Sequence, residues 1–354
     1  MSESLPQGAK PFDFTGNAKE WFGIWIVNLL LSIVTIGIYS AWAKVRTKKY
    51  FYNHTYVEGR NFDYHATGKQ ILIGRLIVIG AVIVFQLITA VLPILGLLLL
   101  IGLLFIFPWL IVRSMIFNAR MSSFSNVRFG FVGTVGQAFL TFLVYPILTA
   151  LTLYTTFPIL DRAVKRFSIN NHKLGQARFN MEVGLGPFYK AFLVAIAWII
   201  AVGLVGVVVT GFSFTDFAMA MENPDAAPGE AAKAIGLFYL LFFIAFLPAV
   251  FIYQALIRNA VYNNTTLEGG HAFASNVTAP QLLWLAVTNM IVVVFTLFLM
   301  LPWAQVRMAR YLAAHTGFIP GGSMDDFVTQ QQEAGGAFGD AYTDLEGIDV
   351  GLPI

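Results

Sequence analysis

The chain contains no cysteine and few charged residues. Of its 354 residues, 57% are apolar and 12% are charged, and phenylalanine alone contributes 33. The absence of cysteine excludes disulfide bonds, thiolate metal ligands and cysteine lipidation. A soluble domain averages about 25% charged residues, so a soluble fold of this length would lack the polar side chains to cover its surface. We therefore expect an integral membrane protein. The net charge of +3 is too small to indicate nucleic-acid binding.

Seven stretches are long and apolar enough to be membrane-embedded helices, since about 20 apolar residues cross the hydrocarbon core. None of them contains Asp or Glu. Because the membrane offers no water to the backbone, helix is the expected state of each. The segments are Trp21–Ala41, Ile71–Leu92, Leu95–Val112, Gln137–Phe157, Phe188–Thr210, Ile235–Leu256 and Leu282–Leu301.

Comparing the chain with itself reveals a recurring unit. A shift of 117 residues places Phe12–Gly16 on Phe129–Gly133, and a shift of 261 places Trp42–Thr55 on Trp303–Thr316. Each unit has an F-x-F strand, a hydrophobic helix and a basic aromatic stretch. In the first two copies, a second strand and a helical hairpin follow.

The sequence thus predicts an all-α polytopic membrane protein, with about seven hydrophobic helices in a 3+3+1 internal repeat. Short cytoplasmic β-strands would flank the first helix of each repeat. The expected divisions are a polar N-terminal segment (1–20), repeat 1 (21–126), repeat 2 (127–270), a partial repeat 3 (271–318) and an acidic disordered tail (319–354).

Two arrangements of the first helices (21–41, 137–157 and 282–301) remain open. The loops after the first and fourth segments are both rich in Lys and Arg, which is typical of cytoplasmic loops. Strands around one helix can pair only if they emerge on one face of the membrane. Both observations favour first helices that enter the membrane and return. The alternative is seven full crossings, which would make the first two copies inverted repeats.

The basic aromatic stretches carry the main candidate binding residues. Their four-residue spacing places them along one slowly twisting stripe of a helix. One interpretation is an interfacial anchor, with Trp at headgroup depth and Arg on phosphate. The other is a specific site for a lipid headgroup or anionic ligand. The candidates are Trp42, Arg46, Tyr50, His54, Arg162, Arg166, Trp303, Arg307, Tyr311 and His315.

Two amides occupy matching positions within first helices, Asn28 and Asn289. Such amides usually form interhelical hydrogen bonds, and a ligand contact is the alternative. The five histidines show no metal-binding spacing, so no metal site is expected. No cofactor motif or nucleophile motif occurs, so we expect neither a cofactor nor an enzyme.

Three motifs carry a family resemblance: F-D-F-T-G (Phe12–Gly16), T-I-G-I-Y-S-A-W-A-K-V-R (Thr35–Arg46) and G-R-N-F-D-Y (Gly59–Tyr64). Over about residues 10–318 the chain resembles the bacterial YjgN-like inner-membrane proteins, a family of unknown function. The resemblance implies a multi-pass protein of the bacterial inner membrane and supplies no substrate. The third copy departs from the strand motif at His271–Ser275.

Two functions follow as hypotheses. The first is a transporter-like, channel-like or lipid-handling conduit, favoured by the repeats and the intramembrane amides. The second is a non-transporting scaffold whose basic stretches bind anionic phospholipid and whose strands bind a cytoplasmic protein partner of unknown identity.

Overall fold

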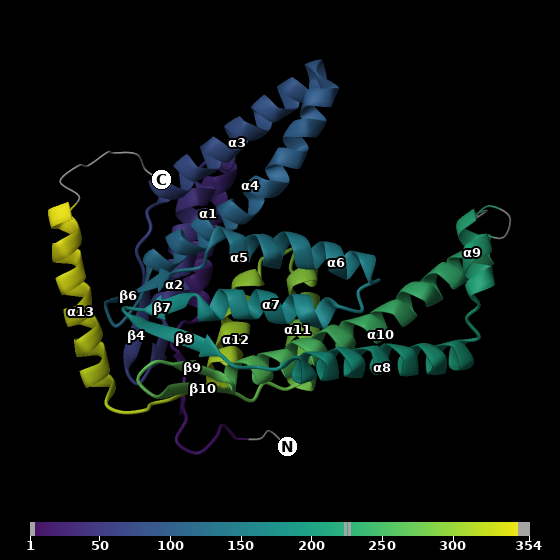
Figure 1. Ribbon diagram of the computed structural model, residues 1–354. Coiled ribbons are helices and arrows are strands. Elements are labelled where there is room, and N and C mark those ends of the chain that lie inside the picture. The colour runs from purple at the N-terminus through teal and green to yellow at the C-terminus, as the bar shows by residue number, and fades with distance from the viewer. Residues whose placement is uncertain (1–3, 223–224, 226–227, 346–354) are drawn as a thin grey trace.

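The computed structural model describes residues 4–222, 225 and 228–345, and over these residues a strand, a helical hairpin and a second strand follow one another five times (Figure 1). The first unit is β2 (Asp13–Phe14), α1 (Ala18–Val34), α2 (Ser40–Asn53) and β3 (Thr55–Val57). The second is β4 (Arg60–Tyr64), α3 (Gly68–Val91), α4 (Pro93–Arg120) and β5 (Ser122–Phe124).

The third unit runs through β6 (Val127–Phe131), α5 (Val135–Phe139), the π-helical turn η1 (Leu140–Val144), α6 (Tyr145–Leu151), α7 (Phe157–Asn170) and β7 (His172–Leu174). The fourth is β8 (Ala177–Met181), α8 (Leu185–Thr210), α9 (Phe214–Glu222), α10 (Pro228–Tyr262) and β9 (Thr265–Leu267). The fifth is β10 (His271–Ser275), α11 (Ala279–Phe295), α12 (Leu301–Ala314) and β11 (Thr316–Ile319). Strand β1 (Lys10–Pro11) precedes them all, and α13 (Met324–Leu345) follows them.

The strands form one antiparallel sheet in the order β1-β11-β10-β9-β8-β7-β6-β5-β4-β3-β2. Its two ends are neighbours in the chain, because only Phe12 separates β1 from β2. Strand β1 pairs with β11, and β2 pairs with β3. The sheet therefore closes into a barrel through residues 10–14. Closure gives short strands of two to five residues the backbone partners that an open edge would lack.

Successive residues of a strand point to opposite faces, so every second side chain points into the barrel. These inward side chains form two layers. A phenylalanine layer comes from β1–β2 and the even-numbered strands, with neighbouring ring centroids 6.0 to 6.3 Å apart. The next layer comes from the odd-numbered strands, and each of its side chains is buried. The phenylalanine layer is Phe12, Phe62, Phe129, Phe179 and Phe273, and the second layer is Val57, Phe124, Leu174, Leu267 and Phe318.

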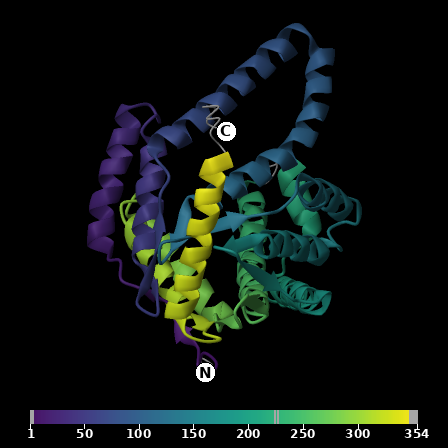
Figure 2. The ribbon, with the colours of Figure 1, turned by 60° about the vertical axis from the view of Figure 1, so that its left-hand side comes forward.

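Helix α13 seals the barrel beyond the second layer. Its first two turns bury Met324, Phe327 and Val328 in the same hydrophobic cluster. The Oε1 atom of Gln331 accepts hydrogen bonds from the backbone N–H groups of Gln176 (2.8 Å) and Ala177 (3.3 Å). Figure 2 shows α13 in front of the strands, and in Figure 1 it lies on the opposite side of the strands from α8 and α10. We name this end of the barrel, with α13, the sealed end.

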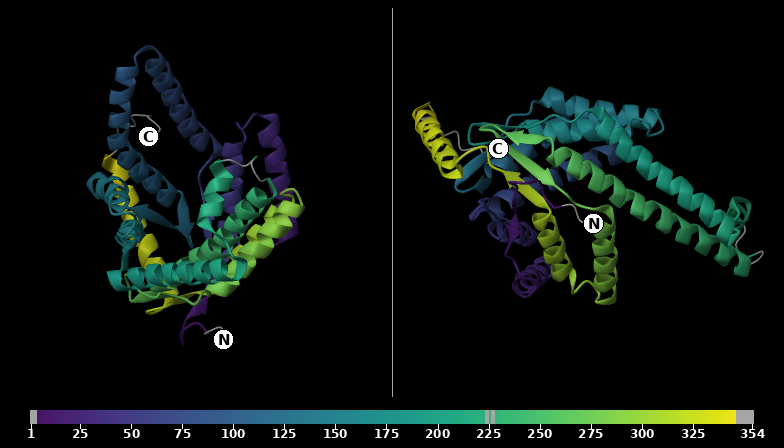
Figure 3. Two further views of the ribbon diagram at one scale, coloured as in Figure 1. Left: turned by 90° about the vertical axis from the view of Figure 1, so that its right-hand side faces the viewer. Right: turned by 90° about the horizontal axis from the view of Figure 1, so that it is seen from below.

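The five hairpins leave the opposite end of the barrel and fall into two lengths. In the second and fourth units, α3, α4, α8 and α10 have 24, 28, 26 and 35 residues and are long and apolar enough to cross a membrane. These two hairpins project in different directions (Figure 3). In the other units, α1 and α11 have 17 residues each, about 25 Å at 1.5 Å per residue. That is less than the roughly 30 Å hydrocarbon core.

A tight turn ends the first helix of each short hairpin. Two successive residues with positive φ reverse the chain at Ile36–Gly37, Leu153–Tyr154 and Leu297–Phe298. The hydroxyl of the preceding threonine accepts the Tyr39 N–H at 2.9 Å in the first hairpin and the Met300 N–H at 3.2 Å in the last. The tips are apolar and exposed: Ile36 is 94% and Leu297 82% exposed. Such tips are suited to a lipid environment.

The predicted fold class is wrong. The described chain is not all-α, and its strands form an eleven-stranded antiparallel near-barrel sheet. Four helices rather than about seven meet the length and apolarity needed to cross a membrane, and the 3+3+1 grouping gives way to five hairpin units. Hydropathy counted 21–41 as one segment, whereas α1 ends at Val34 and a turn follows. Residues 319–354 were expected to be disordered, but α13 packs on the barrel; residues 346–354 lie outside the described residues.

The glycine two residues after the second phenylalanine of the F-x-F-x-G motif is required sterically. A Cβ atom on Gly16 would lie 2.6 Å from the Phe14 ring, and one on Gly133 would lie 2.5 Å from the Phe131 ring. Glycine is therefore needed wherever the second phenylalanine is present. In the fifth unit Ser275 replaces that phenylalanine, and Val277, 2% exposed, fills the space. The departure of this copy from the motif is thus a compensated change in packing.

Candidate binding site at the barrel mouth

Five helices end at the barrel, and the residue that begins each following strand caps the helix before it. Helix C-termini leave backbone carbonyls without partners. Each of these five side chains is hydrogen-bonded to the carbonyl four residues earlier, at 2.5 to 2.8 Å. We call this ring the polar collar; it consists of Thr55, Ser122, His172, Thr265 and Thr316.

The polar collar surrounds two adjoining cavities at the hairpin end of the barrel, which we name the mouth. Their volumes are about 510 and 400 Å³, and Phe12, Thr55, Phe129 and His172 line both. The larger one lies between the phenylalanine layer and the last turns of α7, α10 and α12. Its size falls within the roughly 300–1,000 Å³ range of small-molecule sites. Its walls are mainly apolar, with Leu312 among the residues of α12 that line it.

One cation, Arg258 of α10, lines the larger cavity. Its Nη2 donates to the Thr316 hydroxyl at 2.7 Å, and its guanidinium lies 4.3 Å from the Tyr262 ring centroid. Its Nε is buried and has no hydrogen-bond partner among the described residues. Across the cavity, burial lowers the pKa of the His172 imidazole below its ordinary value, so this side chain is neutral at pH 7. Arg258 therefore supplies the positive charge of the larger cavity.

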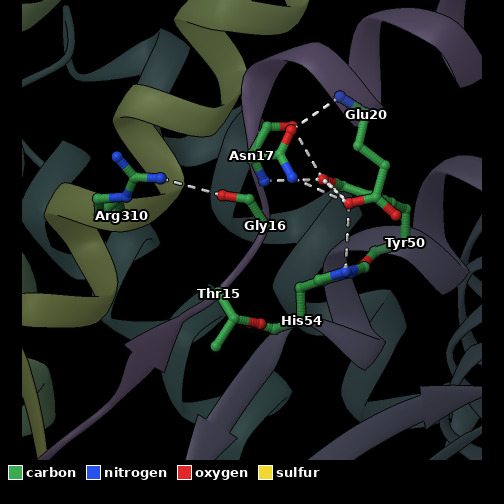
Figure 4. Close-up of polar contacts among 7 residues, drawn as sticks. All are labelled: Thr15, Gly16, Asn17, Glu20, Tyr50, His54 and Arg310. Atoms are coloured by element: carbon green, nitrogen blue, oxygen red, sulfur yellow. Dashed lines mark hydrogen bonds and ion pairs between the residues drawn. The ribbon is translucent and has the colours of Figure 1, made fainter.

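The predicted stripe residues Tyr50 and Tyr311 have internal partners (Figure 4 shows the first). The Tyr50 hydroxyl accepts the Asn17 N–H at 3.0 Å, and the Tyr311 hydroxyl accepts the Thr278 N–H at 3.2 Å. Asn17 and Thr278 are the N-caps of α1 and α11. Each tyrosine thus joins the second helix of its hairpin to the start of the first, a structural role.

The stripe histidines sit at the ends of the same helices. The Nδ1 atoms of His54 and His315 contact the carbonyls of Tyr50 and Tyr311 at 2.8 and 2.9 Å. Both imidazoles lie 4.2 Å from the tyrosine ring centroids. His54 also approaches Glu20 at 3.8 Å. These contacts terminate α2 and α12.

The two intramembrane amides differ in their contacts. Asn289 is buried and accepts a hydrogen bond at 2.9 Å from Arg307, which also donates to Thr288 at 2.6 Å. The structure thus brings together two candidates that the sequence analysis kept apart. Asn28 is buried as well, but neither its Oδ1 nor its Nδ2 has a partner in the described residues.

The remaining candidates are spread over separate hairpins. Trp42 covers the start of α3, since a Cβ on Gly68 would lie 2.4 Å from its ring. Arg46 and Arg166 are exposed, and Arg162 donates to the Val183 carbonyl at 2.6 Å. The Arg307 guanidinium lies 5.2 Å from the Trp303 ring centroid. They do not all meet in one pocket: Arg46 lines one cavity with Tyr50 and His54, and Trp303 and Arg307 line another with Tyr311.

The sequence analysis missed the polar collar and Arg258. A signal for the collar was present. In four copies, a Thr, Ser or His is followed two residues later by an apolar residue, then by a short turn, a second strand and a phenylalanine. T-Y-V-E-G-R-N-F (Thr55–Phe62) and H-K-L-G-Q-A-R-F (His172–Phe179) are examples.

A second polar group lies on the outer face of the barrel. The His65 Nε2 contacts the Ser123 hydroxyl at 2.8 Å, and Asp63 lies 3.7 Å from His65 Nδ1. The chain of contacts from Ser123 through His65 to Asp63 resembles a Ser–His–Asp triad, but Ser123 is only 1% exposed. A nucleophile must reach its substrate, so we assign this group to the pairing of β4 with β5.

Comparison with known proteins places the chain in a family. A family model described as a bacterial protein of unknown function (DUF898) matches residues 9–345. The chain belongs to this family. It is similar to the inner membrane protein YjgN of Salmonella typhimurium (strain LT2), with 27% identity over 343 residues, 86% of this chain and 87% of that protein. The YjgN protein of Escherichia coli (strain K12) is 40% identical over 62 residues, 18% of this chain and 16% of that protein. No solved structure matches the chain.

These findings confirm the resemblance and the coarse class of the protein. The family match covers most of the chain, and α3, α4, α8 and α10 meet the length and apolarity needed to cross a membrane. The DUF898 chain is an integral membrane protein.

Proposed function

We propose that the chain is a multi-pass protein of the bacterial inner membrane in which α3, α4, α8 and α10 cross the bilayer and the three short hairpins enter it and return. Both YjgN relatives are inner membrane proteins, which supports the location. Pairing of β2 with β3 supports the returning hairpin, because it keeps both ends of the first hairpin at the barrel. This arrangement puts the barrel on one side of the membrane and α9 on the other.

Single-cysteine variants test this arrangement cleanly, since the chain has no cysteine. Glu58→Cys lies at a barrel turn, Thr215→Cys on α9, and Leu297→Cys at a short-hairpin tip. A membrane-impermeant thiol reagent should label the first two from opposite sides and leave the third unlabelled from both. Labelling of Leu297→Cys from the same side as Thr215→Cys would show that the last hairpin crosses.

Within that arrangement, we propose that the mouth binds the apolar part of a membrane lipid, which makes the protein a lipid-handling protein. The supporting observation is the asymmetry of the barrel: its mouth has a mainly apolar cavity of about 510 Å³ on the hairpin side, whereas α13 closes the other end. An acyl chain gains from leaving water for such walls, at about 0.8 kcal/mol per buried CH₂. A solute conduit would in addition require α13 to leave the barrel.

The scaffold hypothesis relied on basic stripes that bind lipid headgroups. Tyr50, Tyr311 and Arg307 instead have internal hydrogen bonds, so these stripes offer fewer free donors than their sequence indicates. The mouth is therefore the better supported lipid site.

Filling the cavity tests the lipid proposal. Ala313 of α12 lines it, and Ala313→Trp should reduce the lipid that the purified protein retains after detergent exchange, as counted by native mass spectrometry. Ala81→Trp on the exposed face of α3 is the matched control. Ala309→Leu, a smaller change in the same wall, serves if the larger one prevents folding. Unchanged retention in both cavity variants would refute the proposal.

A further inference from the structure

The charge balance of the larger mouth cavity indicates what kind of lipid it accepts. Among the described residues that line it, Arg258 is a cation and none is Asp or Glu. The salt bridges of the described residues do not include Arg258 either. Arg258 is half-buried and its Nε atom is buried, and a guanidinium partly withdrawn from water without an anion carries a desolvation cost. A ligand with a negative charge would remove that cost.

The dipole of α10 offsets part of the positive charge of Arg258 but provides no hydrogen-bond acceptor for its Nε–H. Arg258 lies near the C-terminus of α10, where the dipole carries roughly −0.5 elementary charge. A dipole supplies no acceptor to the buried Nε–H. The carbonyls of the last turns are already bonded to the polar collar, for example Val261 to Thr265 and Leu312 to Thr316. Nε is therefore the guanidinium donor that an anion at the mouth would use.

The position of Arg258 relative to the polar collar carries a cation in two other units. Arg258 lies seven residues before the collar residue Thr265, and the equivalent positions before Thr55 and His172 are Lys48 and Lys165. Lys48 donates at 2.6 Å to Asn118, which lines the smaller cavity. Three of the five units thus carry a cation two turns from the collar.

The apolar surroundings decide between a free anion and an amphiphile. The floor of the cavity is phenylalanine, and Leu312, Ala309 and Ala313 form the α12 wall. A free phosphate would have to exchange its hydration for these groups, which offer it no hydrogen bonds. An acyl chain loses nothing there, and a carboxylate or phosphodiester at its end forms charge-assisted hydrogen bonds with a guanidinium.

We propose that the mouth is a binding site for an anionic amphiphile, with a single carboxylate or phosphodiester oxyanion on the Arg258 guanidinium and an acyl chain against the phenylalanine layer. This assignment rests on the proposed lipid-handling function and adds the headgroup to it. Thr316 orients the guanidinium by accepting from Nη2, and Tyr262 supports its face.

Competition binding tests the headgroup. The full chain in nanodiscs of neutral lipid is loaded with a fluorescent fatty acid, and palmitate, hexadecanol and inorganic phosphate are compared as competitors. Palmitate should compete at least about tenfold more strongly than hexadecanol, which corresponds to about 1.4 kcal/mol. Phosphate alone should compete weakly. Equal competition by palmitate and hexadecanol, or by palmitate and phosphate, would overturn the proposal.

Variants locate the effect. Arg258→Gln keeps a donor for Thr316 and should abolish the preference for palmitate, while Arg258→Lys should restore part of it. Arg113→Gln removes an arginine on α4 that lies 5.5 Å from the Trp109 ring centroid, outside the mouth, and should leave the preference unchanged. A preference that survives Arg258→Gln would refute the assignment.

The two proposals fail in distinguishable ways. If Ala313→Trp blocks both competitors but they compete equally in the unaltered protein, the lipid site stands and the anionic headgroup is wrong. If Ala313→Trp affects neither competitor, the site itself is wrong.

Discussion

The two ends of the barrel are built from the same strands but differ in how completely their inward side chains fill the interior. On β9, Thr265 faces the mouth and Leu267 faces the sealed end, two residues further along. At the sealed end, large apolar side chains and α13 fill the interior. At the mouth, small hydroxyls bond to the helix ends, and cavities remain. The contrast shows that packing fills the sealed end and leaves space at the mouth, where we propose that a lipid binds.

Truncating Leu267 should have the largest effect. Leu267→Ala opens a cavity in a close-packed layer and should cost about 2–5 kcal/mol of stability. Thr265→Ala removes one capping hydrogen bond and should cost only about 1 kcal/mol. Thermal unfolding in detergent, followed by circular dichroism, compares the two. Equal losses would mean that the two ends do not differ in packing.

Detaching α13 should follow in size. Gln331→Leu leaves the N–H groups of Gln176 and Ala177 without their acceptor, at about 1–3 kcal/mol. Hydrogen exchange over residues 324–334 should accelerate. Gln330→Leu, at an exposed neighbouring position, is the control and should leave exchange unchanged. If both variants behave alike, Gln331 does not hold the helix.

The tyrosines on the mouth side should matter less. Tyr50→Phe and Tyr311→Phe each remove a hydroxyl that accepts an N-cap N–H, a loss of about 0.5–1.5 kcal/mol. Phe167, buried at the equivalent place in the third unit, shows that the ring alone can pack there. Lipid retention should be unaffected in both variants. Reduced retention would return these residues to the list of ligand contacts.

Acidification should loosen the sealed end by a smaller amount. Burial lowers the pKa of His271, which Glu58 partly opposes, and its Nδ1 accepts the Gly321 N–H at 3.1 Å. As the pH falls, the His271 imidazole is protonated in the unfolded chain, at a pKa of about 6.5, before it is protonated in the folded chain. The contribution of His271 to the free energy of unfolding is therefore fully present above about pH 6.5. It falls as the pH drops toward the lower folded value.

His271→Gln should flatten this dependence, measured as the unfolding midpoint between pH 8 and pH 5.5. His172 and His65 also have lowered pKa values through burial, so a residual slope is expected in the variant. A variant slope equal to that of the unaltered protein would exclude His271 as a contributor.

Local patterns anticipated parts of the fold well. The period-two aromatics at Phe12–Phe14 and Phe62–Tyr64 do lie in or beside strands. What failed was the count of about seven long hydrophobic helices, four of which meet the length and apolarity needed to cross a membrane, because hydropathy does not detect a turn inside an apolar run. In the third and fifth units the turn residues Leu153–Tyr154 and Leu297–Phe298 have positive φ without being glycine, so no local breaker marked those turns.

The candidate site was anticipated less well. Spacing placed Tyr50 and Arg307 on surface stripes, yet a four-residue period says only that residues share a helix face. It does not say whether that face meets lipid or another helix. Arg258 was not predicted as a site residue, because a single arginine after an apolar segment is common in membrane proteins. Its meaning comes from the cavity and the missing carboxylate around it.

By itself, the sequence determined the membrane class, the apolar segments and the recurrence of short aromatic strands, since these follow from composition and from the period of a single element. Only the tertiary structure decided that the strands close into one barrel, that α13 seals one end and that Arg258 faces the other. Barrel closure joins β1 to β11 and β2 to β3, pairings that depend on segments some 300 and 40 residues apart. Long-range backbone pairing of this kind leaves no periodic trace in the chain.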